Sequence, residues 1–263
     1  MEYRFDHFNR QLLMEDMAFT AGPKPGDAFP DFDLATSEGG HVRRSDLLGR
    51  PFFVTVGSFT CPMTADSGDI VKRLYGEYAD RVTFLTLYVR EAHPGEHYPQ
   101  PTTFEQKREH ARAYKIRDQI PWPVAVDDVD GSLHLQLDPK PNAVYVANAH
   151  GDVAFRALWS NDERPLRDAL ESITSGTPLV KAERHRRLIP MLGGIGRMDE
   201  MLSLAGRDAR RDVRRQAPPV YALARLAGLF RPLSPAARTV AAATLATGTV
   251  CLATAGLQRV RRR

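Results

Sequence analysis

The chain is poor in cysteine, with two in 263 residues. Two thiols are too few for a disulfide scaffold and too few for a zinc site built from cysteines. The eight histidines lack the spacing of metal ligands, so we expect no bound metal. No long apolar run follows the charged and aromatic residues 1–10, which argues against a secretory leader. A cytoplasmic, reducing environment is therefore expected.

Nothing in the overall composition is extreme. Apolar residues make up 43% of the chain and charged residues 26%, and there are 19 glycines and 19 prolines. These values are ordinary for a soluble globular protein and exclude a collagen-like or wholly disordered chain. The length is sufficient for one good-sized domain with an additional segment, or for two small domains.

Charge is distributed unevenly along the chain. Residues 1–179 contain 19 Lys and Arg against 27 Asp and Glu, a net charge of −8, whereas residues 180–263 contain 17 against 5, a net charge of +12. This asymmetry indicates a folded acidic domain followed by a basic appendage. The S-G-T-P sequence at 175–178 interrupts a helical pattern and places the boundary there. We therefore predict an N-terminal helical segment (1–21), a folded domain (22–176) and an Arg-rich C-terminal extension (177–263).

Two apolar runs predict the central strands of the domain. Residues 51–56 and 82–89 are nearly continuous apolar runs, typical of strands buried on both faces. Apolar residues at helical spacing from 70 to 78 predict a helix between them, and hence a right-handed β-α-β unit. The other expected elements are helices at 3–18, 103–116 and 163–173, a hairpin at 32–42, a helical turn at 45–49, and strands at 124–126, 143–146 and 153–158. This order predicts an α/β fold with a central mixed sheet flanked by helices.

The loops that follow the two central strands carry the candidate chemistry. The first loop, 57–64, contains Cys61, and the second, 90–97, contains Glu91 and His93. Because ligands bind beyond the carboxyl ends of parallel strands, we expect these side chains to be neighbours at one edge of the sheet.

Each candidate has a structural alternative. Cys61 precedes a helix that opens with Pro62, and the free N–H groups of a helix N-terminus stabilise a thiolate. The alternative is an inert buried cysteine. Glu91 is expected to orient His93 as an acid–base pair, and the alternative is a solvated loop that begins at Pro94.

Four stretches resemble a known family. They are G-S-F-T-C-P-M (57–63), L-Y-V-R-E-A-H-P (87–94), P-V-A-V-D-D-V-D-G-S-L (123–133) and A-V-Y-V-A-N-A-H-G-D-V (143–153). The first resembles the selenocysteine-containing motif of the iodothyronine deiodinases, and the second resembles the strand of that family that ends in E-E-A-H. The resemblance covers roughly residues 22–173. It implies a thioredoxin-like fold of the redoxin type, related to peroxiredoxins.

The resemblance also implies roles for individual residues. Cys61 occupies the selenocysteine position, with Ser58 and Thr60 as flanking hydroxyls. Glu91 and His93 occupy the acid and the histidine of E-A-H, which polarise a substrate hydroxyl and supply protons.

The sequence departs from the family at three places. Sulfur replaces selenium at Cys61, Phe59 stands where the family has an auxiliary cysteine, and Pro101 replaces the histidine of a downstream P-Q-H. His97 and His110 are the candidates to replace that histidine.

The expected reaction needs a reductant from outside the domain. The C-P-x-T sequence at 61–64 also resembles peroxiredoxins, although Val54 stands where that family has proline. Cys251, in the extension, is the only other thiol. We therefore expect a redox-active cysteine that attacks a halogen of an iodinated phenol such as thyroxine, or a peroxide. No cofactor is expected, and an external thiol such as glutathione or thioredoxin is expected to restore Cys61.

The extension offers a second interpretation of the chain. Residues 239–258 carry no charge and as a helix would be about 30 Å long, but they are mostly Ala, Thr and Gly. A surface-associated or docking helix is favoured over a membrane span. The arginines from 184 to 215 are expected to attract an anionic membrane surface rather than nucleic acid. The alternative function is a non-enzymatic binding or scaffold module that this tail directs to a membrane or partner, and a homodimer is left open.

Overall fold

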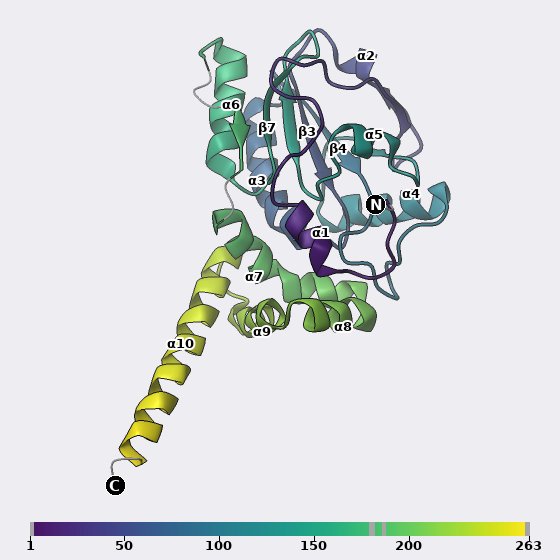
Figure 1. Cartoon of the computed structure of the whole chain (residues 1–263). Coiled ribbons are helices and arrows are strands. Elements are labelled where there is room, and N and C mark those ends of the chain that lie inside the picture. Colours follow the sequence, from purple (N-terminus) through teal and green to yellow (C-terminus); the bar gives the residue numbers. More distant parts are fainter. Residues whose placement is uncertain (1–2, 179–181, 186–187, 261–263) are drawn as a thin grey trace.

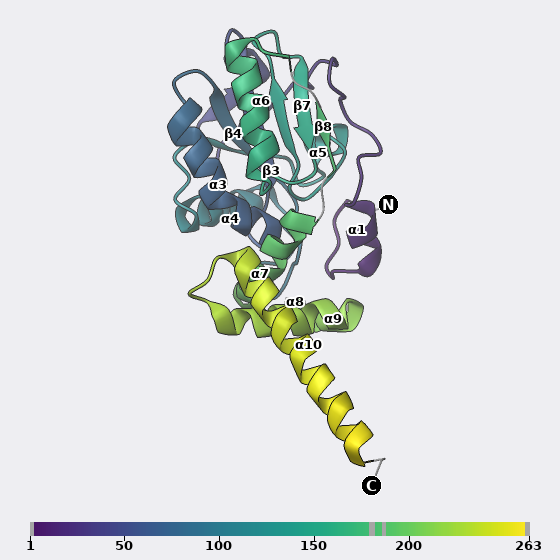
Figure 2. The same cartoon turned by 90° about the vertical axis from the view of Figure 1, so that its left-hand side faces the viewer.

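The computed structural model describes residues 3–178, 182–185 and 188–260. An α/β domain forms the upper body, and four helices of the extension pack beneath it (Figure 1). The last of these, α10 (Pro235–Val260), continues away from the body, and Figure 2 shows the same arrangement from the side.

The domain is built on a six-stranded sheet in the order β5-β4-β3-β6-β7-β8. The strands β3, β4 and β5 are parallel, whereas β6 pairs antiparallel with both β3 and β7. This topology is thioredoxin-like, so the predicted fold is confirmed. The elements are α1 (Arg10–Glu15), β1 (Asp33–Ala35), β2 (His41–Arg43), α2 (Arg44–Leu47), β3 (Phe52–Gly57), α3 (Pro62–Tyr78), β4 (Thr83–Tyr88), α4 (Phe104–Arg117), β5 (Val124–Val126), α5 (Ser132–Gln136), β6 (Val144–Ala147), β7 (Val153–Ala157), α6 (Glu163–Ser175) and β8 (Glu183–Arg184).

The two faces of the sheet bury separate apolar clusters. On one face, Phe53 and Phe84 pack with side chains from α3, α4 and α6. On the other, Val54 and Leu85 pack with the β1–β2 hairpin and the short helices α2 and α5. Adjacent residues of one strand point to opposite faces of the sheet because side chains alternate along a strand.

Most elements lie within a few residues of their predicted bounds, and the differences are local. The predicted helix at 3–18 is only α1, which Asn9 caps by accepting a hydrogen bond from the Leu12 amide. The predicted elements did not include α5 or β8. Thr103 caps α4 by accepting from the Gln106 amide, as the sequence indicated. The three-segment division of the chain stays a prediction.

The extension packs as a helical layer against α3. Its elements after β8 are α7 (Leu188–Ala205), α8 (Arg207–Gln216), α9 (Pro218–Ala227), a 3-10 turn (Gly228–Phe230) and α10. Close approach of α7 depends on two glycines: a Cβ at Gly193 would lie 1.9 Å from Asp66 Oδ2, and one at Gly194 would lie 2.2 Å from Met63 Sδ. The G-G-I-G sequence of α7 is therefore a packing feature. Within the described residues, none of the helices has the length and apolarity of a membrane span.

Candidate active site

The fold brings the two candidate loops together at one edge of the sheet. The strands β3 and β4 pair in parallel register, from Phe52 opposite Thr83 to Gly57 opposite Tyr88. The chain after each strand stays in contact, because the Val89 amide donates to the Gly57 carbonyl at 3.1 Å. The expectation that Cys61, Glu91 and His93 are carried by adjacent loops is therefore met.

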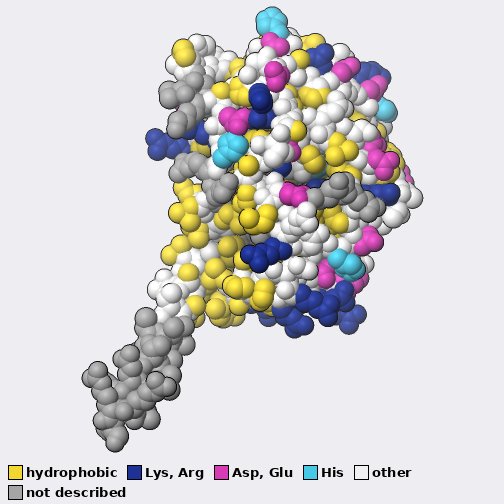
Figure 3. Space-filling model, in the orientation of Figure 1, with side chains coloured by type: hydrophobic (Ala, Val, Ile, Leu, Met, Phe, Trp, Pro, Cys, Tyr) yellow, Lys and Arg dark blue, Asp and Glu magenta, His cyan; other side chains and the backbone are white. Residues whose placement is uncertain are grey.

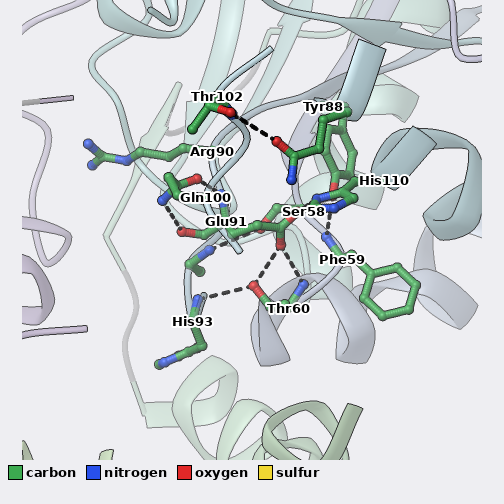
Figure 4. Close-up of polar contacts among 12 residues, drawn as sticks. Ser58, Phe59, Thr60, Tyr88, Arg90, Glu91, His93, Gln100, Thr102 and His110 are labelled. Carbon is green, nitrogen blue, oxygen red and sulfur yellow. Dashed lines mark hydrogen bonds and ion pairs between the residues drawn. The ribbon is translucent and has the colours of Figure 1, made fainter. Parts of the chain in front are cut away.

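A buried carboxylate joins the two loops. Both the backbone N–H and the hydroxyl of Thr60 donate to Glu91 Oε2, at 3.0 and 2.7 Å (Figure 4). The Thr60 hydroxyl in turn accepts from the His93 backbone N–H at 3.1 Å. The Ser58 hydroxyl makes a second link between the loops by accepting from the Ala92 N–H at 3.3 Å. Ser58 and Thr60 thus fix the relative position of the loops.

The expected direct pair between the Glu91 carboxylate and the His93 ring requires correction. Among the described residues, the other partners of this carboxylate are the Tyr88 hydroxyl and His110 Nδ1, the latter at 3.3 Å. The link from Glu91 to His93 runs through Thr60 and reaches the backbone of His93. Glu91 is fully buried and acts as the clamp of the site, since a buried carboxylate needs several donors.

His110 takes a place that the sequence left open. Of the two candidates for the missing histidine, His110 contacts Glu91, whereas His97 is exposed and lies 3.2 Å from the Leu204 carbonyl in the extension. The site therefore keeps a second histidine beside the carboxylate, contributed by α4.

Cys61 occupies the N-cap position of α3, as predicted, but it is buried. Burial raises the pKa of the Cys61 thiol, and hydrogen bonds from the Thr64 hydroxyl and from the Thr64 and Met63 amides oppose that rise. The expectation that the helix N-terminus holds Cys61 as a readily ionised thiolate is wrong, because the effect of burial outweighs these hydrogen bonds. The physical reason is that other segments of the chain cover the helix N-terminus.

His93 is also buried, and its ring packs against Phe8 with a centroid separation of 4.6 Å. Its Nδ1 atom has no hydrogen-bond partner within the described structure. Burial lowers the pKa of His93 to about 4, so the ring is neutral at pH 7. The alternative of a solvated loop at this position is therefore wrong.

Cys61 and His93 line one cavity of about 90 Å³. All three segments of the chain form its walls, which are largely apolar. The N-terminal segment contributes Phe5, Phe8, Leu12 and Asp16, the domain contributes Met63, Arg90 and Trp159 among others, and the extension contributes Met191, Ile195, Met198, Val213 and Val220. The sequence analysis missed Asp16 and Trp159 because nothing local places them beside Cys61, and it gave no role to Arg90, which stands in the second candidate loop.

The second loop also anchors the extension. The Glu96 carboxylate accepts from the backbone N–H groups of Arg207 and Asp208 at 2.7 and 2.8 Å, and so caps the N-terminus of α8. These bonds lower the pKa of Glu96 to about 2. Nearby, the His97 amide donates to the Ala205 carbonyl at 3.0 Å. The loop that carries His93 therefore docks directly on the junction between α7 and α8.

Residues 19–120 match the sequence profile of the iodothyronine deiodinase family. The matched segment includes both candidate loops. Residues 19–120 are therefore similar to the iodothyronine deiodinases. The match points to an oxidoreductase, as predicted.

Solved structures agree with the fold. An uncharacterized conserved protein from Geobacillus kaustophilus is 19% identical, with a TM-score of 0.52 over 63% of this chain and 89% of that one. A hypothetical protein from Sinorhizobium meliloti 1021 is 13% identical, with a TM-score of 0.51 over 61% of this chain and 89% of that one. At these identities the likeness concerns the fold alone.

Replacing Thr60 by valine tests the clamp between the two loops. The change keeps the shape of the side chain but removes the hydroxyl that binds Glu91 and the His93 amide. We expect the free energy of unfolding to fall by about 2 kcal/mol, because buried polar groups lose their partner. Urea denaturation measures this. Thr83→Val at the partly exposed start of β4 is the matched control, and an equal loss in both variants would contradict the role of Thr60.

The Glu96 cap predicts that the extension loosens in acid. A carboxyl whose pKa is lowered by folding stabilises the docked state above its ordinary pKa of 4.5, and this contribution is lost as the pH falls towards about 2. We expect the Arg207 and Asp208 amides to lose hydrogen-exchange protection over that range. In Glu96→Gln the loss should already be present at pH 6. In Glu105→Gln, a control on α4, the wild-type profile should remain; an unchanged profile in Glu96→Gln would contradict the cap.

Proposed function

We propose that the protein is a thiol-dependent oxidoreductase whose Cys61 attacks a halogen of an iodinated phenol, such as thyroxine, or the oxygen of a peroxide. The observation that carries the proposal is the shared cavity of Cys61 and His93 beyond the carboxyl ends of β3 and β4. Its apolar walls suit a small aromatic or alkyl group of an organic electrophile next to Cys61. The match of residues 19–120 to the deiodinases supports the same chemistry.

For an aryl iodide, the Cys61 thiolate forms an S–I bond while the C–I bond breaks, and the aryl carbon takes a proton. An external thiol then displaces iodide from sulfur and forms a mixed disulfide, and a second thiol releases Cys61 as the reduced thiol. For a hydroperoxide, an S–O bond forms while the O–O bond breaks, which leaves a sulfenic acid and an alcohol. External thiols reduce the sulfenic acid through the same mixed disulfide.

The groups around Cys61 and His93 support these steps by their positions, and the steps do not depend on a thiolate that is already formed before the substrate binds. The amides of Met63 and Thr64 and the Thr64 hydroxyl surround the sulfur and stabilise the thiolate once it forms. His93, neutral at pH 7, offers an unpartnered Nδ1 to a substrate hydroxyl. The Glu91 clamp binds Thr60 and Tyr88 and so fixes the relative position of the two loops. No bound cofactor is part of the proposal, and glutathione or thioredoxin supplies the electrons.

A panel of electrophiles tests the proposal. The full-length protein is incubated with dithiothreitol or glutathione and either an iodophenol or an organic hydroperoxide, and iodide release or hydroperoxide loss is followed. Turnover of at least one class, above the rate of the free thiol, is expected. Failure with both classes, for protein whose Cys61 is in the reduced state, would overturn it.

The burial of Cys61 favours a second candidate, a binding or scaffold module that the extension directs to a partner. Lys and Arg side chains gather over α8 and apolar side chains over neighbouring helices of the extension (Figure 3). Arg207, Arg214 and Arg215 are exposed there, as are Leu229 and Leu233. Such a surface fits an anionic membrane better than nucleic acid. Binding of the protein to anionic vesicles, without any thiol turnover, would favour this candidate. The cytoplasmic location and the homodimer stay predictions.

A further inference from the structure

The cavity contains few groups that exchange protons. Its ionisable lining residues are Asp16, Cys61, Arg90 and His93. Arg90 keeps its proton, and its guanidinium is engaged with the carbonyls of Tyr3 and Pro139. His93 is a poor proton acceptor at pH 7 because burial lowers its pKa to about 4. The thiol proton of Cys61 therefore needs another acceptor.

Asp16 is held beside the cavity from both sides. It follows α1 directly, and the Lys140 ammonium donates to the carbonyl of the preceding residue, Glu15, at 2.9 Å. On the other side, the Asp138 carboxylate accepts from the amides of Thr20 and Ala21. Both anchors lie between α5 and β6 in the domain, so the N-terminal segment is tied to the site that it covers.

We propose that Asp16 is the proton-transferring residue of the Cys61 site. The inference rests on the proposed function. The Asp16 carboxylate takes the proton of the Cys61 thiol as the S–I or S–O bond forms. The resulting carboxylic acid then gives that proton to the aryl carbon or alkoxide that leaves, so that Asp16 is ionised again and no net proton is consumed in this step.

The electrostatic surroundings match this role. Burial raises the pKa of Asp16 to about 7, with Glu15 and Asp138 acting in the same direction and Arg90 and Lys140 in the opposite one. A group with a pKa near the working pH is the most effective acid–base catalyst. The charge of Asp16 also acts on the sulfur, since ionised Asp16 raises the pKa of Cys61.

This double effect provides a sharp test with Asp16→Asn. Removing the charge lowers the Cys61 pKa, so alkylation of Cys61 by iodoacetamide at pH 7 should stay equal to wild type or become faster. Removing the base should lower kcat/KM for an iodophenol or hydroperoxide about a hundredfold and abolish the limb of its pH profile near 7. Glu15→Gln, one residue away, is the comparison variant: it should keep kcat/KM within a few-fold of wild type but move the limb near 7 to lower pH, because the Glu15 charge helps to raise the pKa of Asp16.

The outcomes separate this inference from the proposed function. If Asp16 only repels the thiolate, alkylation and turnover both rise in Asp16→Asn, and the inference is overturned. A limb near pH 7 that persists in the variant, or a parallel fall in alkylation and turnover, also overturns it. If the wild-type protein turns over neither electrophile, the proposed function fails first and the inference falls with it.

Discussion

Replacing Cys61 by serine is expected to lower thiol-dependent turnover at least about a thousandfold. A hydroxyl at the N-cap of α3 keeps the helix intact, because serine is a favoured N-cap residue. It is a far weaker nucleophile than a thiol, however, and it cannot form the sulfur–halogen bond or the sulfenic acid. Steady-state assays of iodide release and hydroperoxide loss under dithiothreitol measure the effect.

The matched control is Cys251→Ser, which removes the only other thiol of the chain. This variant should keep wild-type turnover with an external reductant present. If Cys61→Ser retains activity while Cys251→Ser loses it, the nucleophile has been assigned to the wrong cysteine.

Opening the contact between the domain and the extension is expected to give the second large effect. A Cβ at Gly95 would lie 2.5 Å from the Ala205 carbonyl oxygen, so Gly95→Ala must displace the end of α7 from the loop that carries His93. Because the extension helps to bury Cys61, we expect iodoacetamide to label this thiol at least about ten times faster at pH 7. Part of the increase follows from a lower Cys61 pKa, since burial is the main cause of its rise.

Gly76→Ala on α3 serves as the control for this substitution, because nothing lies within 4 Å of the position of the new Cβ. Its labelling rate should equal that of the wild type. An unchanged rate in Gly95→Ala would contradict the interpretation that the extension covers the site. A rise in KM for an apolar hydroperoxide, with the rate for hydrogen peroxide preserved, would further indicate that the extension forms the wall of the substrate cavity.

The central part of the fold was predictable from local patterns. The apolar runs at 51–56 and 82–89 become β3 and β4, since strands buried on both faces carry continuous apolar sequence. Parallel pairing of these strands then follows from the helix between them, and it places Cys61 and His93 on adjacent loops. The position of Cys61 at the N-cap of α3 was indicated by Pro62.

The packing of the N-terminal segment and the extension over the site could not be predicted from local patterns. Its parts come from residues far apart in the sequence, such as Phe8 against His93 and Met191 of α7 against the cluster that contains Cys61 and Met63. Such contacts leave no periodic pattern in the sequence, so the burial of Cys61 and the place of Asp16 could not be derived from it. The link between Glu91 and His93 through Thr60 also depends on side-chain geometry that spacing alone does not fix.

The account depends most on Cys61 being the atom that reacts. The most direct test exposes the reduced, folded protein to one equivalent of an iodophenol or an organic hydroperoxide and follows the Cys61-containing peptide by mass spectrometry. We predict that Cys61 is oxidised in proportion to product, and that an added thiol returns it to the reduced form through a mixed disulfide. Product formation with the Cys61 thiol unchanged throughout would contradict the account.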